Sequence, residues 1–413
     1  MLKSHTKTIF ETLGRNPIHP FPARMAPGIA LDALGESTKP LTVLDPMAGS
    51  GTVLALARAN GHRALGVDID PLAVLLAGVW TRTVDADRVT DKAAEVLDRA
   101  KAAVRSLPSG QAYPADCDRE TRKFIRYWFD DYARRQLASL SMAIHRVHDE
   151  ATRDVLWCGF SRLIITKTAG ASLAMDLAHS RPHREYTYAP VKPFNRFTSA
   201  VETVVTNCPH PGSGTRGPST VVKCGDARKL DIKNASIDLV LTSPPYLNAI
   251  DYMRCSKFSL VWMGHTVGEL RKIRADSIGT EASSGDALDL DWVTSLIKQL
   301  GLKPALSTRH YALLAQYVWD MGRAFTEVTR VLRSGGRAVY VVGDSTIRNT
   351  FVKNSAIIAA VAEEHGLRLQ SRQSRALPAN RRYLPPPKRN GSTAALDSRM
   401  RREVVLVFNK PAA

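Results

Sequence analysis

A glycine-rich turn between two apolar segments constrains the fold of this 413-residue chain more than any other feature. Residues 41–44 form a short apolar run and residues 53–57 open like a helix. The turn between them consists of Asp45, Pro46, Met47, Ala48, Gly49, Ser50, Gly51 and Thr52. Glycine adopts backbone conformations that a side chain forbids, so such a turn can approach a ligand closely. A strand, a glycine turn and a helix in this order predict an α/β sheet with a ligand beyond the strand's carboxyl end.

The composition of the turn narrows the class of ligand. It lacks the lysine of a phosphate-binding loop and the third glycine of the dinucleotide fingerprint. A methionine-like ligand is therefore favoured over a nucleotide phosphate. An ordinary glycine turn without a ligand is the alternative.

Carboxylates follow the next two strand-like runs. Asp68 comes directly after the apolar residues 64–67, where an acidic residue can accept both hydroxyls of a ribose. Asp70 is the second candidate for that role, because Asp70-Pro71 is equally typical of a helix cap. Asp226 follows residues 221–224 and is a candidate partner for the adenine amino group of a nucleoside ligand. A plain turn aspartate is its alternative interpretation.

A second motif follows another buried strand. Residues 237–241 are largely apolar and lead into Ser243, Pro244, Pro245 and Tyr246. The Ser243 side chain and the Pro244 carbonyl can accept the two hydrogens of an exocyclic amine while proline fixes the backbone. Tyr246 can stack on a base rotated out of its duplex. A polyproline turn is the alternative, but the position beyond a buried strand favours a catalytic role.

A third segment, residues 19–27, completes a resemblance to a known family. With the glycine turn and the Ser-Pro-Pro-Tyr tetrad, the chain resembles the S-adenosylmethionine-dependent DNA amino-methyltransferases, which methylate cytosine N4 or adenine N6. The resemblance implies S-adenosylmethionine as cofactor, duplex DNA with base flipping as partner, and cytosine N4 as target because serine opens the tetrad. It implies cofactor contacts for the whole turn, for Asp68 and Asp226, and for Phe21, Pro22, Ala23 and Arg24.

The chain departs from that family at two places. Met47 replaces the usual phenylalanine of the turn, a role that a polarizable thioether can fill. The long segment between Asp70 and Val221 falls where the family has no usual target-recognition insertion. Three alternatives stay open. They are an N6-adenine DNA methyltransferase, an RNA guanine-N2 methyltransferase, since related tetrads occur in that group, and a nucleic-acid-binding protein with a vestigial cofactor fold.

The fold implied is a Rossmann-like, seven-stranded class I methyltransferase sheet with a large, mainly helical insertion. We expect strands at 41–45, 63–68, 219–224, 236–242, 336–343, 367–373 and 402–409, the last antiparallel. The catalytic domain would comprise residues 1–83 and 206–413. Residues 84–205 would form the insertion, with helices near 86–106, 119–149 and 151–168. This insertion is the leading candidate for target recognition, and the loop after the tetrad, with Asp251, Tyr252 and Arg254, is the second.

The charge balance agrees with a nucleic-acid partner. The chain carries 57 Lys and Arg residues against 39 Asp and Glu residues, a formal charge of +18. One basic cluster spans residues 119–135, where the interleaved aromatic residues have helical spacing and are expected to face the core. The other spans residues 372–402 and is interpreted as a basic loop near the active face, with a solvated connector as the alternative.

The remaining features exclude several classes of site. Five cysteines show no paired metal-ligand spacing and no disulfide framework, and Pro182 between His179 and His183 opposes a helical metal site. No metal is expected. No apolar run is long enough to span a bilayer, so we expect a soluble, cytoplasmic protein without a membrane partner. The sequence leaves the oligomeric state open.

Overall fold

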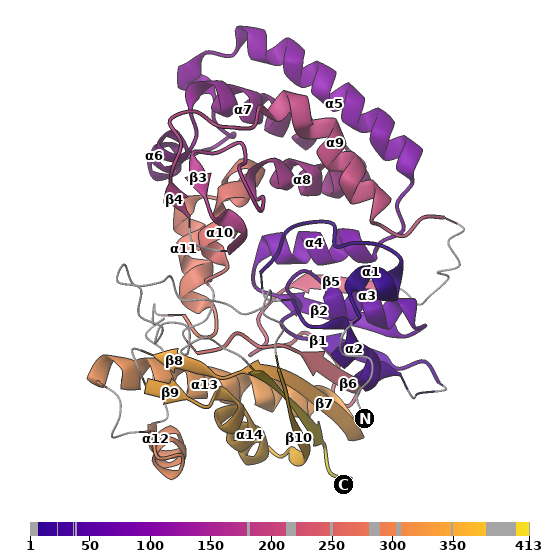
Figure 1. Cartoon of the computed structure of the whole chain (residues 1–413), viewed down its shortest axis with the longest axis vertical. Coiled ribbons are helices and arrows are strands. Elements are labelled where there is room, and N and C mark those ends of the chain that lie inside the picture. Colours follow the sequence, from indigo (N-terminus) through magenta and orange to yellow (C-terminus); the bar gives the residue numbers. More distant parts are fainter. Residues whose placement is uncertain are drawn as a thin grey trace.

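The computed structural model describes residues 7–22, 24–35, 37, 39–179, 182–211, 220–247, 251–280, 290–302, 307–347, 350–376 and 402–412. Its framework is one seven-stranded sheet (Figure 1). Across the sheet the strands are β10 (Arg368–Ala376), β11 (Arg402–Asn409), β7 (Leu332–Gly343), β6 (Ile237–Thr242), β1 (Thr42–Asp45), β2 (Arg63–Asp68) and β5 (Thr220–Cys224). Only β11 runs antiparallel to its neighbours. The class I sheet and its antiparallel last strand are confirmed.

The strand order reverses between β1 and β6. From β1 the chain passes through α3 (Thr52–Ala59) to β2, and through α4 (Pro71–Thr81) and the helical insertion to β5. It then returns across the sheet, so that β6 pairs with β1 on the side opposite β2. Open α/β sheets bind ligands beyond the carboxyl ends of the strands at such a reversal. The glycine turn after β1 and the tetrad after β6 therefore lie at the same crevice.

Alternating side chains divide the sheet into two apolar faces. Val43 and Leu239 pack with α2 (Pro27–Leu34) and α3 on one face. Leu44 and Val240 pack on the other face with the helices α12 (Leu290–Gln299), α13 (Thr308–Val331) and α14 (Asn354–Glu364). The short elements outside these layers are α1 (Ile9–Leu13), β8 (Ser345–Ile347) and β9 (Thr350–Val352).

A separate helical layer lies beyond α4 (Figure 1). It contains α5 (Ala86–Ser106), α6 (Arg119–Trp128), α7 (Asp131–His145), α8 (Glu150–Ile164) and α9 (Pro193–Thr206), with η1 (Ser109–Gln111), β3 (Ala174–Met175), η2 (Leu177–His179) and β4 (His183–Arg184). The segment after the tetrad joins it as α10 (Met253–Leu260), η3 (Val261–Met263) and α11 (Val267–Asp276). Trp157, Phe160, Phe258 and Trp262 share one core, so both candidate target-recognition segments are packed together.

The single helix expected over 119–149 is two helices, and that expectation was wrong. Phe129 is extended, and the Asp130 side chain accepts a hydrogen bond from the Ala133 amide, which starts α7 anew. Among the aromatic residues of α6, Phe124 and Trp128 pack on Phe258, whereas Tyr127 is half exposed. In the second basic cluster, residues 377–401 lie outside the described residues.

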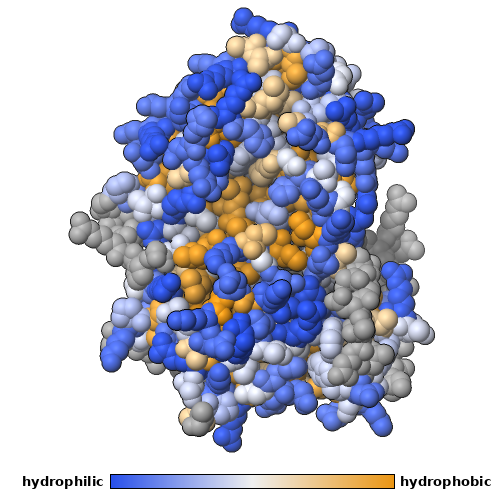
Figure 2. All heavy atoms as spheres, turned by 180° about the vertical axis from the view of Figure 1, so that it is seen from behind, coloured by the Kyte–Doolittle hydropathy of each residue, from blue (hydrophilic) through white to orange (hydrophobic). Residues whose placement is uncertain are grey.

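The surface of the molecule is divided by polarity. Viewed from behind, apolar side chains gather at mid-height between two strongly polar ends (Figure 2). Within the described residues, no helix combines the length and the apolar character needed to cross a membrane.

Candidate active site

The turn after β1 requires both of its glycines. Gly49 and Gly51 have φ angles of 50° and 82°. A Cβ at Gly51 would lie 2.8 Å from Cα of Ala77 in α4, and a Cβ at Gly49 would lie 3.2 Å from the ring of Phe21. An added side chain would therefore collide with the backbone of α4 at Gly51 and crowd the Phe21 ring at Gly49, and the positive φ of both positions favours glycine.

Asp68, at the end of β2, organises the neighbouring backbone. Its Oδ2 accepts a hydrogen bond of 2.7 Å from the Gly49 amide, and its Oδ1 accepts one of 2.9 Å from the Asp70 amide. Burial raises the pKa of Asp68, and these hydrogen bonds oppose the rise. Each carboxylate oxygen has a further lone pair, so the group can still accept hydroxyls from a ligand.

Asp70 is engaged in structural contacts. Its Oδ1 caps α4 through the Leu72 amide at 2.9 Å, and its Oδ2 accepts a hydrogen bond of 2.5 Å from Ser256 in α10. Burial raises the pKa of Asp70 to about 6. The helix cap is the alternative role that its position before Pro71 indicates.

Asp45, the last residue of β1, is buried beside β6. Its side chain is 3% exposed, and Oδ1 accepts a hydrogen bond of 2.7 Å from the hydroxyl of Thr242. Burial raises the pKa of Asp45 to about 7, although the bonds from Thr242 and the Met47 amide stabilise the charged form. This contact fixes the start of the glycine turn against the residue that precedes the tetrad.

The tetrad has a defined pattern of donors and acceptors. The Ser243 hydroxyl donates to the Val341 carbonyl at 3.0 Å, and the Tyr246 hydroxyl lies 3.4 Å from Ser243 Oγ. Tyr317 of α13 donates to the Pro245 carbonyl at 3.1 Å. The Pro244 carbonyl accepts no hydrogen bond from the described residues. The only hydroxyl hydrogen of Ser243 is used in the bond to the Val341 carbonyl, so its oxygen can only accept a hydrogen bond from any further polar group.

The N-terminal segment lies across the glycine turn. Phe21 stacks on Tyr252, with ring centroids 5.3 Å apart and planes 16° from parallel. Arg24 donates from Nε to the Ser50 hydroxyl at 3.0 Å and from its guanidinium to the His19 carbonyl. Pro22 is buried, and Ala23 falls outside the described residues.

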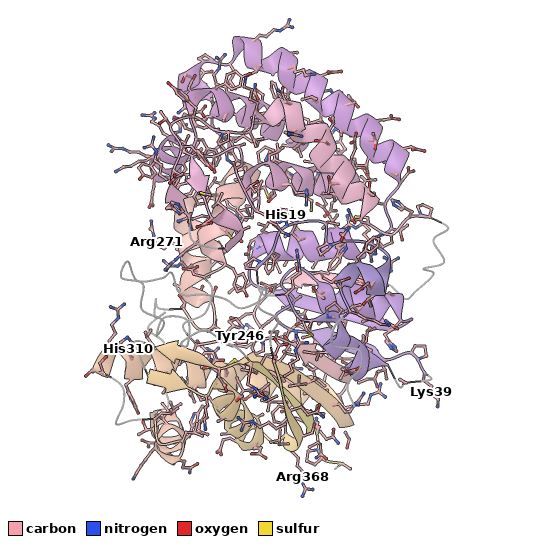
Figure 3. The ribbon with its side chains drawn as sticks, viewed as in Figure 1. His19, Lys39, Tyr246, Arg271, His310 and Arg368 are labelled. Atoms are coloured by element: carbon pink, nitrogen blue, oxygen red, sulfur yellow. The ribbon has the colours of Figure 1, made fainter. Side chains whose placement is uncertain are left out.

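His19 connects this segment to the helical layer (Figure 3). Its Nδ1 lies 2.7 Å from the Pro20 carbonyl, so Nδ1 carries the hydrogen and Nε2 accepts from Ser161 of α8 at 2.9 Å. Ser161 Oγ lies 2.9 Å from Ser259 Oγ in α10. Burial lowers the pKa of His19 to about 3, so the ring is neutral at physiological pH.

Asp226 is paired with a neighbouring guanidinium. Arg228 binds both Asp226 oxygens, at 3.0 and 2.7 Å, and contacts Asp320 at 2.6 Å. Arg228 also donates to the Asp276 carbonyl at the end of α11. An adenine amino group would therefore have to share the Asp226 carboxylate with Arg228.

The segment after the tetrad is held by ion pairs. Asp251 accepts from Nε of Arg254 at 3.0 Å and from Nε of Arg274 at 2.5 Å. Of the three residues proposed there, Tyr252 contacts Phe21, Asp251 is paired, and Arg254 is exposed. Residues 248–250, and residues 281–289 and 303–306 of the polar stretch that follows, lie outside the described residues.

The part of the chain that the structure describes holds no cluster of three or more His, Cys, Asp or Glu side chains able to bind a metal. Its cysteines are all free thiols, and only Cys224 is exposed.

A known protein is similar in sequence to most of this chain. No known family profile matches the chain. The type II methyltransferase M.MvaI of Kocuria varians is 21% identical over 374 residues, which cover 84% of this chain and 81% of the relative. The similarity thus extends along most of both chains.

Solved structures of methyltransferases are also similar to this chain, at low identity. A methyltransferase of Methanosarcina mazei is 9% identical, with a TM-score of 0.31, over 93% of this chain and 98% of the other. A TehB-like methyltransferase of Corynebacterium glutamicum is 12% identical, with a TM-score of 0.29, over 92% of this chain and 85% of the other.

The residues around the turn have the chemistry to fit S-adenosylmethionine. The glycines leave a backbone cradle, and the Thr52 hydroxyl is buried without a partner among the described residues. Gly49, Gly51, Thr52, Asp68 and Phe21 would hold S-adenosylmethionine, which supplies a methyl group activated on a sulfonium. Pro46, Met47, Ala48 and Ser50 complete the same turn.

Three residues at the site were missed by the sequence reasoning. Thr242 had a detectable signal, because it is a polar residue at the end of a buried strand, directly before the tetrad. Tyr317 and Asp320 had none, because they belong to a 24-residue helix that periodicity marks only as amphipathic. Their positions depend on how α13 packs below the tetrad.

Proposed function

We propose that this chain is an S-adenosylmethionine-dependent methyltransferase that transfers the methyl group to an exocyclic amine in duplex DNA, with N4 of cytosine as the target. The observation that carries the proposal is the hydrogen bond from Ser243 to the Val341 carbonyl at 3.0 Å. It leaves the serine oxygen as an acceptor, which is the polarity that an amino group requires.

The Pro244 carbonyl is the second acceptor. It has no hydrogen-bond partner in the described part of the chain, whereas the next carbonyl, that of Pro245, is taken by Tyr317. Two acceptors facing one amine would draw its hydrogens away from the ring plane. The nitrogen lone pair, otherwise conjugated with the base, then becomes available for attack.

The other groups of the site would position the base. Tyr246, between the sheet and the helical layer in Figure 3, offers a ring on which an extruded base can stack. Such a site works mainly by alignment of the amine with the methyl group and by fixed dipoles. The proton lost from the amine leaves to solvent or to a nearby acceptor.

DNA as the substrate is supported by three observations. The charge of +18 attracts phosphates, the tetrad matches amine methylation on a base, and the similar protein of Kocuria varians is a type II methyltransferase. A cytoplasmic location agrees with this substrate. Asp68 and Asp226 are proposed to contact the ribose and the adenine of the cofactor, and residues 84–205 to recognise the target.

The proposal is tested with duplex DNA and saturating labelled cofactor. Ser243→Ala should lower the maximal rate by on the order of 10- to 1000-fold, because one acceptor of the amine is lost. Tyr246→Ala should mainly weaken capture of the base. Ser334→Ala, an exposed serine near the start of β7 and outside residues 84–205, is the matched control and should leave turnover unchanged. Normal turnover in both tetrad variants would contradict the proposal.

A further inference from the structure

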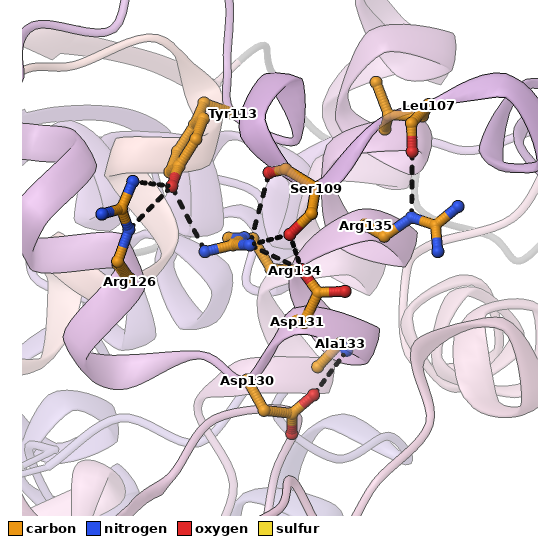
Figure 4. Close-up of polar contacts among 9 residues, drawn as sticks. All are labelled: Leu107, Ser109, Tyr113, Arg126, Asp130, Asp131, Ala133, Arg134 and Arg135. Atoms are coloured by element: carbon orange, nitrogen blue, oxygen red, sulfur yellow. Dashed lines mark hydrogen bonds and ion pairs between the residues drawn. The ribbon is translucent and has the colours of Figure 1, made fainter.

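A cavity of about 430 Å³ lies in the helical layer between η1, α6, the start of α7 and β4. Its wall includes Ser109, Tyr113, Arg126, Asp131, Arg134 and Arg184, and most of their contacts are drawn in Figure 4. We name it the Arg–Tyr cavity. None of these residues belongs to the cofactor turn or to the tetrad.

Arg134 is the buried polar group of this wall. The residue is 6% exposed, and its Nε has no hydrogen-bond partner among the described residues. Its terminal nitrogens are engaged, with Nη1 on the Tyr113 hydroxyl at 3.2 Å and Nη2 on Asp131 at 2.6 Å and Ser109 Oγ at 2.7 Å. Leaving a buried N–H of a charged group unpaired is costly, so an acceptor that reached this nitrogen would stabilise the site.

Tyr113 supplies a second unused donor. Its hydroxyl accepts hydrogen bonds from Nε and Nη2 of Arg126, at 3.2 and 3.1 Å, as well as from Arg134. Because these contacts use the oxygen only as an acceptor, the hydroxyl hydrogen remains to be donated. Tyr113 and Arg134 both line the cavity, and each therefore keeps one donor without an acceptor among the described residues.

The charges around the cavity favour an anion. Neither Arg126 nor Arg184 has a carboxylate partner among the described residues, and Arg184 lies over the Tyr127 ring at 5.2 Å. The two acidic residues of the wall are occupied. Asp130 binds the amides of Ala133 and Ala189, and Asp131 binds Ser109 and Arg134.

We propose that the Arg–Tyr cavity binds a phosphate group. Phosphate oxygens are strong acceptors, and arginine forks are the groups that bind them with the best geometry. The phosphate comes either from the backbone of a nucleic acid or from a free phosphate compound. The first source rests on the proposed function, and in that case the cavity positions the substrate without reading its sequence.

Two single variants test the cavity without disturbing its buried arginine. Arg126→Gln and Arg184→Gln remove exposed guanidinium groups, and Arg368→Gln removes an exposed guanidinium at the opposite end of the molecule as the matched control (Figure 3). Thermal melting verifies that each full-length variant is folded. Neither residue lies in the catalytic machinery, so methyl transfer itself is not the readout.

The first arm measures binding of a labelled duplex at several salt concentrations. Each cavity variant should weaken binding about tenfold and reduce the slope of log K against log salt by about 0.9, the value for one lost phosphate contact. The second arm measures binding of inorganic phosphate by calorimetry. Wild-type protein and Arg368→Gln should bind it, and the cavity variants should not.

The outcomes distinguish the sources. Weaker duplex binding by the cavity variants assigns the phosphate to a nucleic-acid backbone. Loss of inorganic phosphate binding with unchanged duplex binding assigns it to a free compound. Cavity variants that match Arg368→Gln in both arms overturn the proposal. Neither measurement requires methyl transfer. A protein that methylates no DNA could still lose phosphate binding in the cavity variants, so failure of the proposed function and failure of this inference give different results.

Discussion

The hydroxyl of Thr242 donates a hydrogen bond of 2.7 Å to Oδ1 of Asp45, and it thereby joins the last residue of β6 to the last residue of β1. Thr242 is fully buried and Asp45 is 3% exposed. The glycine turn continues from Asp45 and the tetrad continues from Thr242. One buried hydrogen bond therefore sets the position of the cofactor segment relative to the proposed catalytic segment.

Removal of this bond should cost both stability and activity. Thr242→Val keeps the shape of the side chain but leaves the buried Asp45 carboxyl without its donor, which should lower the free energy of unfolding by about 1–3 kcal/mol. Urea denaturation measures the change. Thr90→Val, at an exposed site of α5, is the control and should stay within about 0.5 kcal/mol of wild type. Equal effects of the two substitutions would argue against a structural role for the bond.

Asp45 should make stability depend on pH. Burial raises its pKa from an ordinary value of 3.8 to about 7, so the folded protein binds one proton more than the unfolded chain between these values. The stabilisation is complete below the lower pKa and is lost as pH rises through about 7. Relative to Asp45→Asn, wild-type protein should lose up to about 1.4 kcal/mol per pH unit in this window. A difference that is constant from pH 4 to 7 would refute this.

The effect of steric crowding at Gly51 can be distinguished from the effect of its positive φ. Gly51→Ala combines a φ of 82° with a Cβ only 2.8 Å from Ala77, whereas Gly61 has a φ of 79° and open space around it. Gly61→Ala should cost only the strain of about 1–2 kcal/mol. Gly51→Ala should cost more and should also reduce cofactor affinity, measured by calorimetry. Similar melting temperatures for both variants would mean that α4 yields to the added carbon.

Tyr317 should influence the chemical step through the tetrad backbone. Tyr317→Phe removes the donor to the Pro245 carbonyl. That carbonyl could then compete with the Pro244 carbonyl for the hydrogens of the amine, so the maximal rate should fall about tenfold with KM little changed. Tyr311→Phe is the control on the same helix, because its hydroxyl makes only a long contact of 3.4 Å with Thr294. Kinetics at saturating cofactor compare the two, and identical rates would assign Tyr317 to packing alone.

Much of the sheet could be predicted from the sequence because its central strands are buried on both faces. Residues 63–68, 402–409 and 86–106 were delimited correctly, since apolar runs and helical periodicity end there at polar residues. The break between α6 and α7 was missed. The apolar spacing is the same in both flanking helices, so periodicity alone does not reveal that the Asp130 side chain caps a new helix between them.

The contacts between distant segments could not be predicted in the same way. Motif spacing brings the turn and the tetrad to one edge of the sheet, but it does not reveal that Arg228 occupies the Asp226 carboxylate. Nor does it reveal that the segment after the tetrad packs into the insertion through Phe258 and Trp262. These contacts depend on where whole helices dock, which local patterns do not encode.

The central claim is that Ser243, Pro244, Pro245 and Tyr246 present an amino nitrogen of DNA to the methyl donor. The most direct measurement is incubation of the enzyme with labelled S-adenosylmethionine and either duplex DNA or total RNA, followed by digestion and mass identification of the methylated nucleoside. The account predicts N4-methylcytosine from the duplex and none with Ser243→Ala. Label only on adenine N6 would replace the target base, and label only on RNA guanine, or on neither nucleic acid, would contradict the account.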